Sequence, residues 1–396
     1  PPNNPPAETQ GAEDLLHPVI FDSFLEKLEL GGALRVRGEL RDPRGPVTGL
    51  GTSTLGTGRA RVHVLAKVDP FLSGYFEFQE VVASLGNRSR TQVHQAYLRA
   101  DRLLGDSTLQ AGRFELFKGE GRLVAPDDWL LTPNTFDGVS FEGDFFRGLL
   151  DLSAWVTQAP AGQGGFSNST DFQGIYGAWK PTRELGVDTY VLRQNDGNLQ
   201  LDMFTTGLRL YGETFDSIRW GLEGAVQTGT RGRRQGSGYA LIGQASVPLE
   251  GGHHVGLEYA FASGDDPARD NKSETFVAPY PDAHRFYGLA DIVSFSNLND
   301  IALRYWLVWN ERWTMHLDLH NFSRDKITDR IYTGPGGAGI RGTGSHSIGT
   351  EVDAWLTGRI SANYSFDFGG AYFIPGDGIR LNDNQIWLFA QLEIRF

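Results

Sequence analysis

At residues 386–396 the sequence reads IWLFAQLEIRF, and this segment gives the clearest indication of the fold class. Its side chains alternate, so that Ile386 and Phe396 fall on an apolar face and Glu393 and Arg395 on a polar face. Successive side chains of an extended strand point to opposite faces, and a period of two therefore predicts a β-strand. A soluble sandwich buries such an apolar face, whereas a transmembrane barrel turns it to lipid and keeps the polar face in the lumen.

The same alternation recurs along the chain in segments that break at Gly, Pro, Asn or Asp. Their lengths suit tilted strands of about 9–11 residues, which are long enough to cross a bilayer. The pattern predicts eighteen strands, near residues 28–41, 58–69, 71–82, 91–101, 106–117, 136–145, 148–158, 172–181, 184–194, 201–211, 216–229, 237–248, 253–264, 298–310, 312–324, 347–358, 360–374 and 385–396.

The connections between these segments alternate between short and long. Residues 102–105 and 146–147 are short connections, whereas 118–135, 265–297 and 325–346 are long ones. Outer-membrane barrels have short turns at the periplasmic side and long loops outside. An even number of strands places both chain ends at the periplasmic side. We expect the three long loops to be able to fold inward and narrow the pore.

Two regions are predicted. Residues 1–27, which open with PPNNPPAETQGAED, are expected to form a flexible periplasmic tail. Residues 28–396 are expected to form one antiparallel transmembrane β-barrel, an all-β fold with a single domain. The alternative is a soluble all-β protein such as a propeller. A propeller would show a shared motif repeated about every 40 residues, and no such repeat is visible.

Composition and motifs restrict the function. The 36 Lys and Arg residues against 48 Asp and Glu give a net charge of −12, which argues against a nucleic-acid partner. The absence of cysteine excludes disulfides, zinc–thiolate sites, iron–sulfur clusters and cysteine nucleophiles. Nucleophile-elbow, phosphate-loop and zinc-protease motifs are also missing from the sequence. We therefore predict that the protein is not an enzyme and that it has no cofactor.

Four stretches carry a resemblance to a known family. They are GRFELFKGEGRLVAPDDWLLTPNTFDGV at 112–139, HRFYGLADIVSFSNL at 284–298, DLHNF at 318–322 and GTEVDAW at 349–355. In their order and spacing they resemble the alginate export family of outer-membrane barrels. The resemblance implies a monomeric barrel of eighteen strands in the outer membrane of a Gram-negative bacterium. It also implies that an anionic polysaccharide leaves the cell through a lumen lined by basic residues.

The polar faces of the predicted strands supply candidates for the pore lining. Arginine pairs planar carboxylates at two points, and nearby acidic residues would keep each contact weak enough for release. The same residues could instead form an Arg–Glu lattice that stiffens the wall, and the sequence leaves both readings open. The candidates for pore lining or substrate contact are Arg35, Arg37, Arg99, Arg113, Arg209, Arg219, Arg304, Arg395, Glu142, Asp144 and Asp318.

Two groups of side chains carry atoms that could hold a metal ion. Imidazoles with a carboxylate suit transition metals, and clustered carboxylates suit calcium. Polar groups in a wet lumen and a solvated acidic loop are the alternative readings. The groups are His316, Asp318 and His320 on one strand face, and the loop residues Asp265, Asp266 and Asp270.

Three function classes remain open. The first is export of a secreted, anionic polysaccharide, with periplasmic proteins of an export machine as possible partners. The second is a general or solute-specific diffusion porin, and the third is a structural barrel that scaffolds an envelope assembly. Outer-membrane lipid is a partner in all three. The lumen candidates predict a preference for anions, because charges at a constriction outweigh those at the mouths.

Overall fold

A computed structural model describes residues 26–42, 52–84, 88–160, 170–182, 184–215, 217–266, 270–334 and 337–396. The tail predicted at 1–27 lies outside the described residues, apart from its last two positions. Within the described ranges, no helix is both long enough and apolar enough to cross a membrane.

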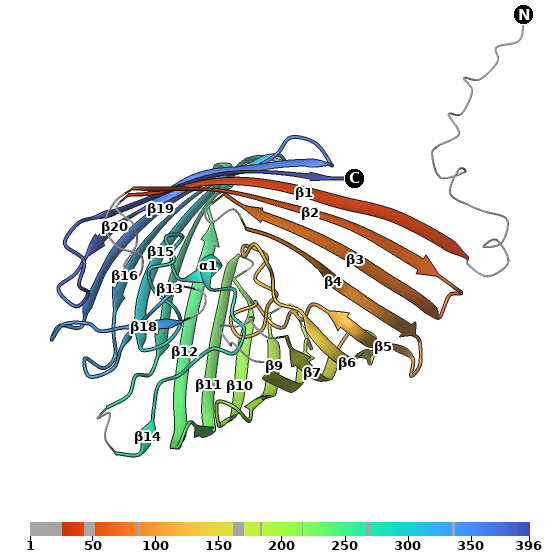
Figure 1. The fold of residues 1–396 in the computed structure, drawn as a ribbon, viewed down its shortest axis with the longest axis horizontal. Coiled ribbons are helices and arrows are strands. Elements are labelled where there is room, and N and C mark those ends of the chain that lie inside the picture. Colours follow the sequence, from red (N-terminus) through yellow and green to blue (C-terminus); the bar gives the residue numbers. More distant parts are fainter. Residues whose placement is uncertain are drawn as a thin grey trace, which may run out of the picture.

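Eighteen strands form a closed antiparallel barrel (Figure 1), which confirms the predicted fold class. Most predicted boundaries are within a few residues of the observed ones. The wall strands are β1 (Lys27–Asp42), β2 (Ser53–Lys67), β3 (Leu72–Ala83), β4 (Arg88–Asp101), β5 (Asp106–Phe114), β6 (Phe136–Phe145), β7 (Leu150–Ala159), β8 (Thr170–Trp179), β9 (Gly186–Asp196), β10 (Leu201–Thr214), β11 (Ile218–Arg231), β12 (Arg234–Pro248), β13 (His253–Ala262), β15 (Leu298–Asn310), β16 (Trp313–Ser323), β19 (Ser347–Arg359), β20 (Tyr364–Pro375) and β21 (Gln385–Arg395).

Each wall strand pairs with the next one along the chain, and β21 pairs with β1 to close the barrel. At this seam Arg35 lies opposite Glu393, and Ala33 lies opposite Arg395. The remaining elements are short and belong to the connections. They are the 3-10 helix η2 (Glu250–Gly252), the strands β14 (Lys272–Ser273), β17 (Ile331–Thr333) and β18 (Ala338–Ile340), and the helix α1 (Ala283–Phe286).

The outer surface of the barrel is apolar and the inner surface is polar or aromatic. On β21, Ile386 and Leu388 are exposed, whereas Gln391 and Glu393 point inward and are buried. Large apolar side chains are exposed in the same way on almost every wall strand. This is the arrangement that the alternation at residues 386–396 predicted, and it places the apolar face toward lipid.

The two ends of the barrel differ. One end carries only short turns, and β1 begins and β21 ends there. The other end carries the long connections, including 115–135 after β5, 263–297 after β13 and 324–346 after β16. We call these ends the short-turn end and the long-loop end.

Candidate functional site: the barrel lumen

Two connections from the long-loop end fold into the lumen, where the segment after β5 and helix α1 lie inside the ring of strands (Figure 1). We call segments 115–135 and 274–297 together the plug. Backbone hydrogen bonds join its two parts. The Ala125 N–H donates to the Tyr280 carbonyl at 2.8 Å, and the Tyr280 N–H donates to the Leu123 carbonyl at 2.9 Å. The plug is therefore one packed unit rather than two independent loops.

Apolar burial explains why these segments leave the solvent. The Tyr280 ring lies edge-on to Phe136 at 4.9 Å and to Phe172 at 4.8 Å, and all three side chains are fully buried. Nearby, Tyr287 stacks on Phe295 at 4.8 Å. Burying an aromatic side chain contributes roughly 1.5–3 kcal/mol. The hydrophobic core of this protein thus lies inside the barrel, between the plug and the wall.

A buried charge network joins the plug to β10, β12 and β13. The Arg122 guanidinium donates to both carboxylate oxygens of Glu258, at 3.1 and 2.5 Å, and to the Gln244 side chain at 3.1 Å. Glu120 accepts from Gln244 at 2.8 Å and from Arg209 at 2.5 Å. Arg122 and Glu258 are almost completely buried. Buried charges are tolerated when they are paired and hydrogen-bonded in this way.

These contacts keep the plug residues charged. Burial by itself would raise the pKa of Glu120, but the guanidinium groups of Arg209 and Arg122 outweigh burial and hold the pKa below its usual value. Burial would likewise lower the pKa of Arg122, and the Glu258 carboxylate outweighs it and raises the pKa. Both plug side chains therefore stay ionised at neutral pH.

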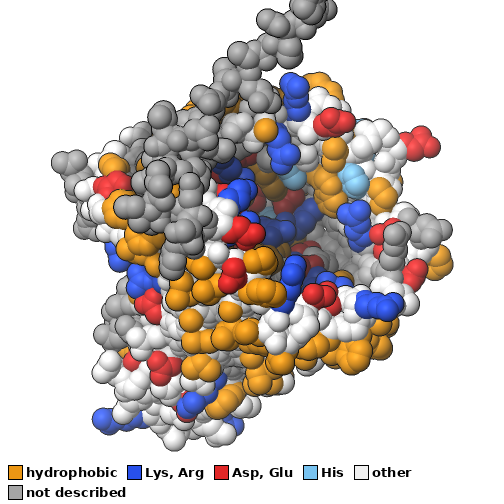
Figure 2. All heavy atoms as spheres, turned by 90° about the vertical axis from the view of Figure 1, so that its right-hand side faces the viewer, with side chains coloured by type: hydrophobic (Ala, Val, Ile, Leu, Met, Phe, Trp, Pro, Cys, Tyr) orange, Lys and Arg blue, Asp and Glu red, His pale blue; other side chains and the backbone are white. Residues whose placement is uncertain are grey.

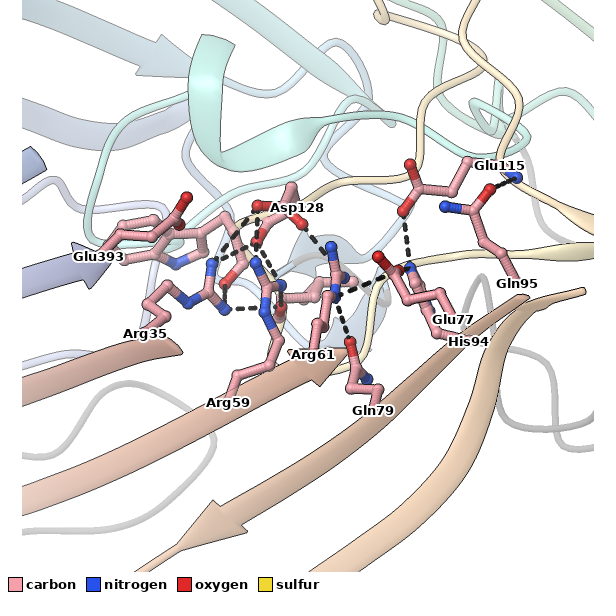
Figure 3. A network of polar contacts seen from close by, with 12 residues as sticks. Arg35, Arg59, Arg61, Glu77, Gln79, His94, Gln95, Glu115, Asp128 and Glu393 are labelled. Atoms are coloured by element: carbon pink, nitrogen blue, oxygen red, sulfur yellow. Dashed lines mark hydrogen bonds and ion pairs between the residues drawn. The ribbon is translucent and has the colours of Figure 1, made fainter. Parts of the chain in front are cut away.

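Arginines of β1 and β2 hold the opposite side of the plug. Figure 3 shows Asp128 between the side chains of Arg35, Arg59 and Arg61. The Asp128 carboxylate accepts from Arg59 at 2.8 Å and lies 3.3 Å from Arg61. Arg35 donates to the backbone carbonyls of Asp128 at 2.6 Å and Leu130 at 3.0 Å. Although burial would raise the pKa of Asp128, the guanidinium of Arg59 leads the cations that lower it.

Trp129 extends the same contact toward the seam. The Arg37 guanidinium lies 3.8 Å from the Trp129 ring centre and donates to the Trp129 carbonyl at 2.9 Å. The other part of the plug contributes His284, which stacks on Trp129 at 3.9 Å, and Trp387 of β21 meets Trp129 edge-on. Cation–π and stacking contacts of this kind fix the orientation of the indole.

Polar side chains continue around the wall beyond Asp128 (Figure 3). Arg61 donates to Gln79 at 2.7 Å and lies 3.8 Å from the Glu77 carboxylate. His94 and Glu115 are 2.7 Å apart. Cations on β1 and β2 are therefore partly balanced by carboxylates of the neighbouring strands.

The inner faces of β15, β16 and β19 are acidic and lie beneath the plug. The Glu351 carboxylate accepts from the Ala290 N–H at 2.8 Å, and the neighbouring Asp353 is also buried. His320 lies 2.9 Å from Asp300 on this wall. Because the plug covers these carboxylates, they face its backbone rather than open space. The two walls are thus opposite in character, and the plug meets each with complementary groups.

A cavity of about 560 Å³ opens beside the plug toward the short-turn end. Figure 2 looks at that end of the barrel, and shows a hollow whose walls carry basic and acidic side chains. Arg209 and Arg304 of the wall and Arg285 of the plug line the cavity.

Five of the predicted lining residues lie deep in the lumen as structural groups. Arg35, Arg37 and Arg209 bond the plug, as described above. Arg304 donates to Asp318 at 2.9 Å and to the carbonyl of Phe286 in α1 at 2.9 Å. The same side chains therefore face the lumen and also form the polar contacts that hold the plug and the wall together.

Other predicted residues lie toward the short-turn end and are more exposed. Arg99 bonds Asp101 at 2.9 Å, and Arg395 bonds Glu393 at 2.6 Å. Arg219 is 71% exposed and lies 3.9 Å from a carboxylate oxygen of Glu213.

The two acidic candidates Glu142 and Asp144 follow one another on the inner face of β6. Glu142 pairs with Lys118 of the plug at 2.5 Å. Asp144 accepts from the Gly148 N–H of the following turn at 2.5 Å.

The structure places Arg113 outside the lumen, contrary to the sequence analysis. It pairs with Asp137 at 2.6 Å and lies opposite it in the register. Asp137 is two residues from Val139 on β6 and so points to the same face, and Val139 is exposed on the outside of the barrel. The next pair, Phe114 and Phe136, is buried inside. The register between β5 and β6 thus turns Arg113 to the outer face near the long-loop end.

Neither proposed metal group is arranged as a metal site. Across the described ranges, no three His, Asp or Glu side chains are grouped so that they could hold an ion. Asp265 accepts from the Glu274 N–H and pairs with Arg234, both at 3.1 Å. On β16, His316 stacks on Trp355 at 4.4 Å, a wall contact.

The charged residues of the plug are not among the residues that the sequence predicts to line the pore. Glu120, Arg122 and Asp128 lie in the predicted loop 118–135, outside the alternating segments from which the lining candidates come. A signal was present, because this loop places charges beside the apolar residues Leu123 and Val124. A loop of mixed charge and apolar character is one that can enter a polar lumen.

Comparisons with known proteins agree with this geometry. The sequence profile described as alginate export matches residues 26–386. No curated protein matches the sequence. The fold is similar to three outer-membrane porins of Pseudomonas aeruginosa. OpdK, solved with vanillate, gives a TM-score of 0.68 at 14% identity and covers 94% of this chain and 99% of its own. OpdO gives a TM-score of 0.67 at 17% identity, and the match covers 95% of this chain and 98% of OpdO. OprD gives a TM-score of 0.65 at 15% identity, and the match covers 94% of this chain and 96% of OprD.

Proposed function

Because the chain belongs to the alginate export family and forms a channel in the outer membrane of a Gram-negative bacterium, we propose that it passes an anionic carbohydrate. The short-turn end faces the periplasm and the long-loop end the exterior. The carbohydrate would move along the lumen past the plug, leaving the cell as a secreted polysaccharide. Periplasmic proteins that deliver the chain would be its partners.

The arginine cluster of β1 and β2 is the observation that carries this proposal. Arg35 and Arg37 donate to backbone carbonyls of the plug, which carry no net charge, and Arg37 also pairs with Glu39 at 3.0 Å. Arg35, Arg59 and Arg61 surround the Asp128 carboxylate of the plug at 3.7, 2.8 and 3.3 Å, and Glu77, 3.8 Å from Arg61, balances part of their charge. The carboxylates of β15, β16 and β19 lie beneath the plug and are matched by Arg304 and by backbone N–H groups. This distribution favours anions along the arginine side.

Current block in planar bilayers tests the proposal. Oligomers of a uronic acid and neutral oligomers of glucose, matched in length, are added to one side of the reconstituted channel. The proposal expects the charged oligomers to block the current at much lower concentration. Equal block by both kinds of oligomer would overturn it.

A porin for small carboxylate-bearing solutes is the second candidate. The plug favours it, because a unit held at both walls by buried charge pairs leaves less room for a polymer. The likeness in fold to OpdK, solved with vanillate, supports the same reading. Swelling of proteoliposomes separates the two candidates. Entry of sodium glucuronate together with exclusion of a hexauronate would favour the small-solute porin.

A further inference from the structure

We propose that the cavity at the periplasmic end of the plug is a binding site for a sugar acid, a pyranose ring that carries a carboxylate. This inference rests on the proposed function and adds where the carbohydrate is held and by which residues. The site uses the wall strands β10 to β15 and helix α1 of the plug.

Small inward side chains create the space for the ring. In the register of the sheet, Ser246 of β12 lies opposite Gly256 of β13, with Arg219 and Arg304 on either side. The row thus has large cations at its ends and almost no side chain in the middle. The cavity volume of about 560 Å³ lies within the range of about 300–1,000 Å³ usual for small-molecule sites. One or two sugar rings fit such a volume.

Arg285 is the cation best placed for the carboxylate. It is exposed on α1 and lines the cavity from the plug side. No carboxylate among the described residues lies within ion-pair distance of it. Asp282 attracts it only at longer range, and its guanidinium lies 5.2 Å from the Phe286 ring centre. A guanidinium with free N–H groups can take a carboxylate at two points.

The acidic residues that line the cavity do not neutralise this group. Glu120 and Glu258 are already bonded by Arg209 and Arg122. Glu213 is at the outer edge, 3.9 Å from Arg219. The cavity therefore keeps an available positive charge beside acids that are already paired, which favours an anionic ligand over a neutral one.

Aromatic and amide groups make the site suitable for binding a sugar ring. Trp306 lines the wall and is held by stacking on His254 at 4.9 Å, and Tyr211 lies beneath the Arg209 guanidinium at 4.0 Å. Gln244 and Ser246 add hydrogen-bonding groups. Amphipathic rings with a few polar groups suit a ligand that has both C–H faces and hydroxyls. A small acid without a ring would leave these groups unused.

Calorimetric titration of the full-length protein in detergent tests the site, with D-glucuronate, D-glucose and acetate as probes. We expect glucuronate to bind at least about tenfold more tightly than either of the others, since each 1.4 kcal/mol is a factor of ten. Arg285→Gln should weaken glucuronate binding by about tenfold or more, by removing the charge-assisted pair. The control Arg147→Gln, an exposed arginine in the turn after β6 on the same side, should leave binding unchanged.

A filled cavity gives an independent variant. A Cβ at Gly256 would meet Ser246 and Trp306 at 3.4 Å, an ordinary contact, so Gly256→Leu is expected to fold. It should abolish glucuronate binding. Unchanged glucuronate binding in both Arg285→Gln and Gly256→Leu would overturn the inference, as would equal affinity for acetate. A channel that selects anions but shows no glucuronate binding would refute the site alone, whereas a cation-selective channel would refute the proposed function.

Discussion

Arg122 connects the plug to the barrel wall through a pair of hydrogen bonds to Glu258, and both side chains are almost fully buried. Its guanidinium also lies 3.9 Å from the Phe286 ring of α1. One side chain thus contacts both parts of the plug and the wall. Removing one member of a buried pair leaves the other charge without its partner, which is costly.

Arg122→Met should therefore weaken docking of the plug by about 3 kcal/mol. The free energy of local opening is measured by hydrogen exchange of peptides covering residues 118–130, and single-channel conductance should rise. The matched control is Arg99→Met, which removes an exposed ion pair and should cost less than about 1 kcal/mol. Exchange in Arg122→Met that equals the wild type would contradict the role given to this arginine.

Asp127 makes the plug sensitive to pH. Its carboxylate is buried, and burial together with Asp282 and Asp291 raises its pKa to about 8. The folded protein therefore holds a proton that the unfolded chain releases near its ordinary pKa. Stability falls as pH rises between these two values and levels off above about 8.

We therefore expect the amides of residues 127–132 and of Asn134 to exchange faster at pH 9 than at pH 6, after correction for the intrinsic pH dependence of exchange. Asp127→Asn should remove most of this difference, because the amide does not ionise. Asparagine tolerates the positive φ of 54° found at this position. An equal pH dependence in Asp127→Asn and the wild type would assign the effect to another group.

The residue scale is also where prediction from sequence reached its limit. Alternation showed that Arg35, Arg37 and Arg209 point inward, because the side-chain period of a strand is local. It could not show that Arg122 would meet Glu258, since that contact joins residues 136 positions apart. It also misplaced Arg113, whose direction depends on the register with β6 near the end of β5.

Strand β21 shows how one element reveals the fold. Its apolar face is continuous because lipid contacts it along the full length, and its polar face carries Gln391 and Glu393. No tertiary information is needed to read such a pattern. The same reasoning located all eighteen wall strands, whereas the path of the long connections depended on packing between distant segments.

Substitution on the two faces of β21 should have unequal effects. Leu392→Arg puts a charge on the lipid face and should destabilise the barrel by about 2–4 kcal/mol if the site is near the bilayer midplane. The adjacent Gln391→Glu faces the lumen opposite Arg37 and should cost much less. Unfolding by urea in lipid vesicles measures both. Equal destabilisation by the two variants would argue against the assignment of faces.

The seam between β1 and β21 can be tested by crosslinking. Ala33 and Arg395 are opposite each other, and facing residues of antiparallel strands lie about 4.5–5.5 Å apart, within reach of a disulfide. The double variant Ala33→Cys, Arg395→Cys should crosslink on mild oxidation. Ala33→Cys with Gln391→Cys is offset by about 13 Å along the strand and should not. The native chain has no cysteine that could compete.

At the scale of the whole molecule, the barrel separates two environments and the plug crosses between its walls. The net charge of −12 does not describe the passage, because many carboxylates lie beneath the plug or in the mouths. The groups that remain beside open space include Arg219 and Arg285, and the cluster of Arg59 and Arg61 adds to the same potential. Field lines concentrate in a narrow, low-dielectric passage, so these few charges dominate.

The reversal potential across a salt gradient in planar bilayers shows whether the lumen prefers anions. With wild-type protein in dilute potassium chloride, where screening is weak, we expect the reversal potential to be displaced toward the equilibrium potential of chloride. The preference should shrink as salt is raised. A reversal potential displaced toward the equilibrium potential of potassium at low salt would contradict the passage of an anionic carbohydrate through this lumen.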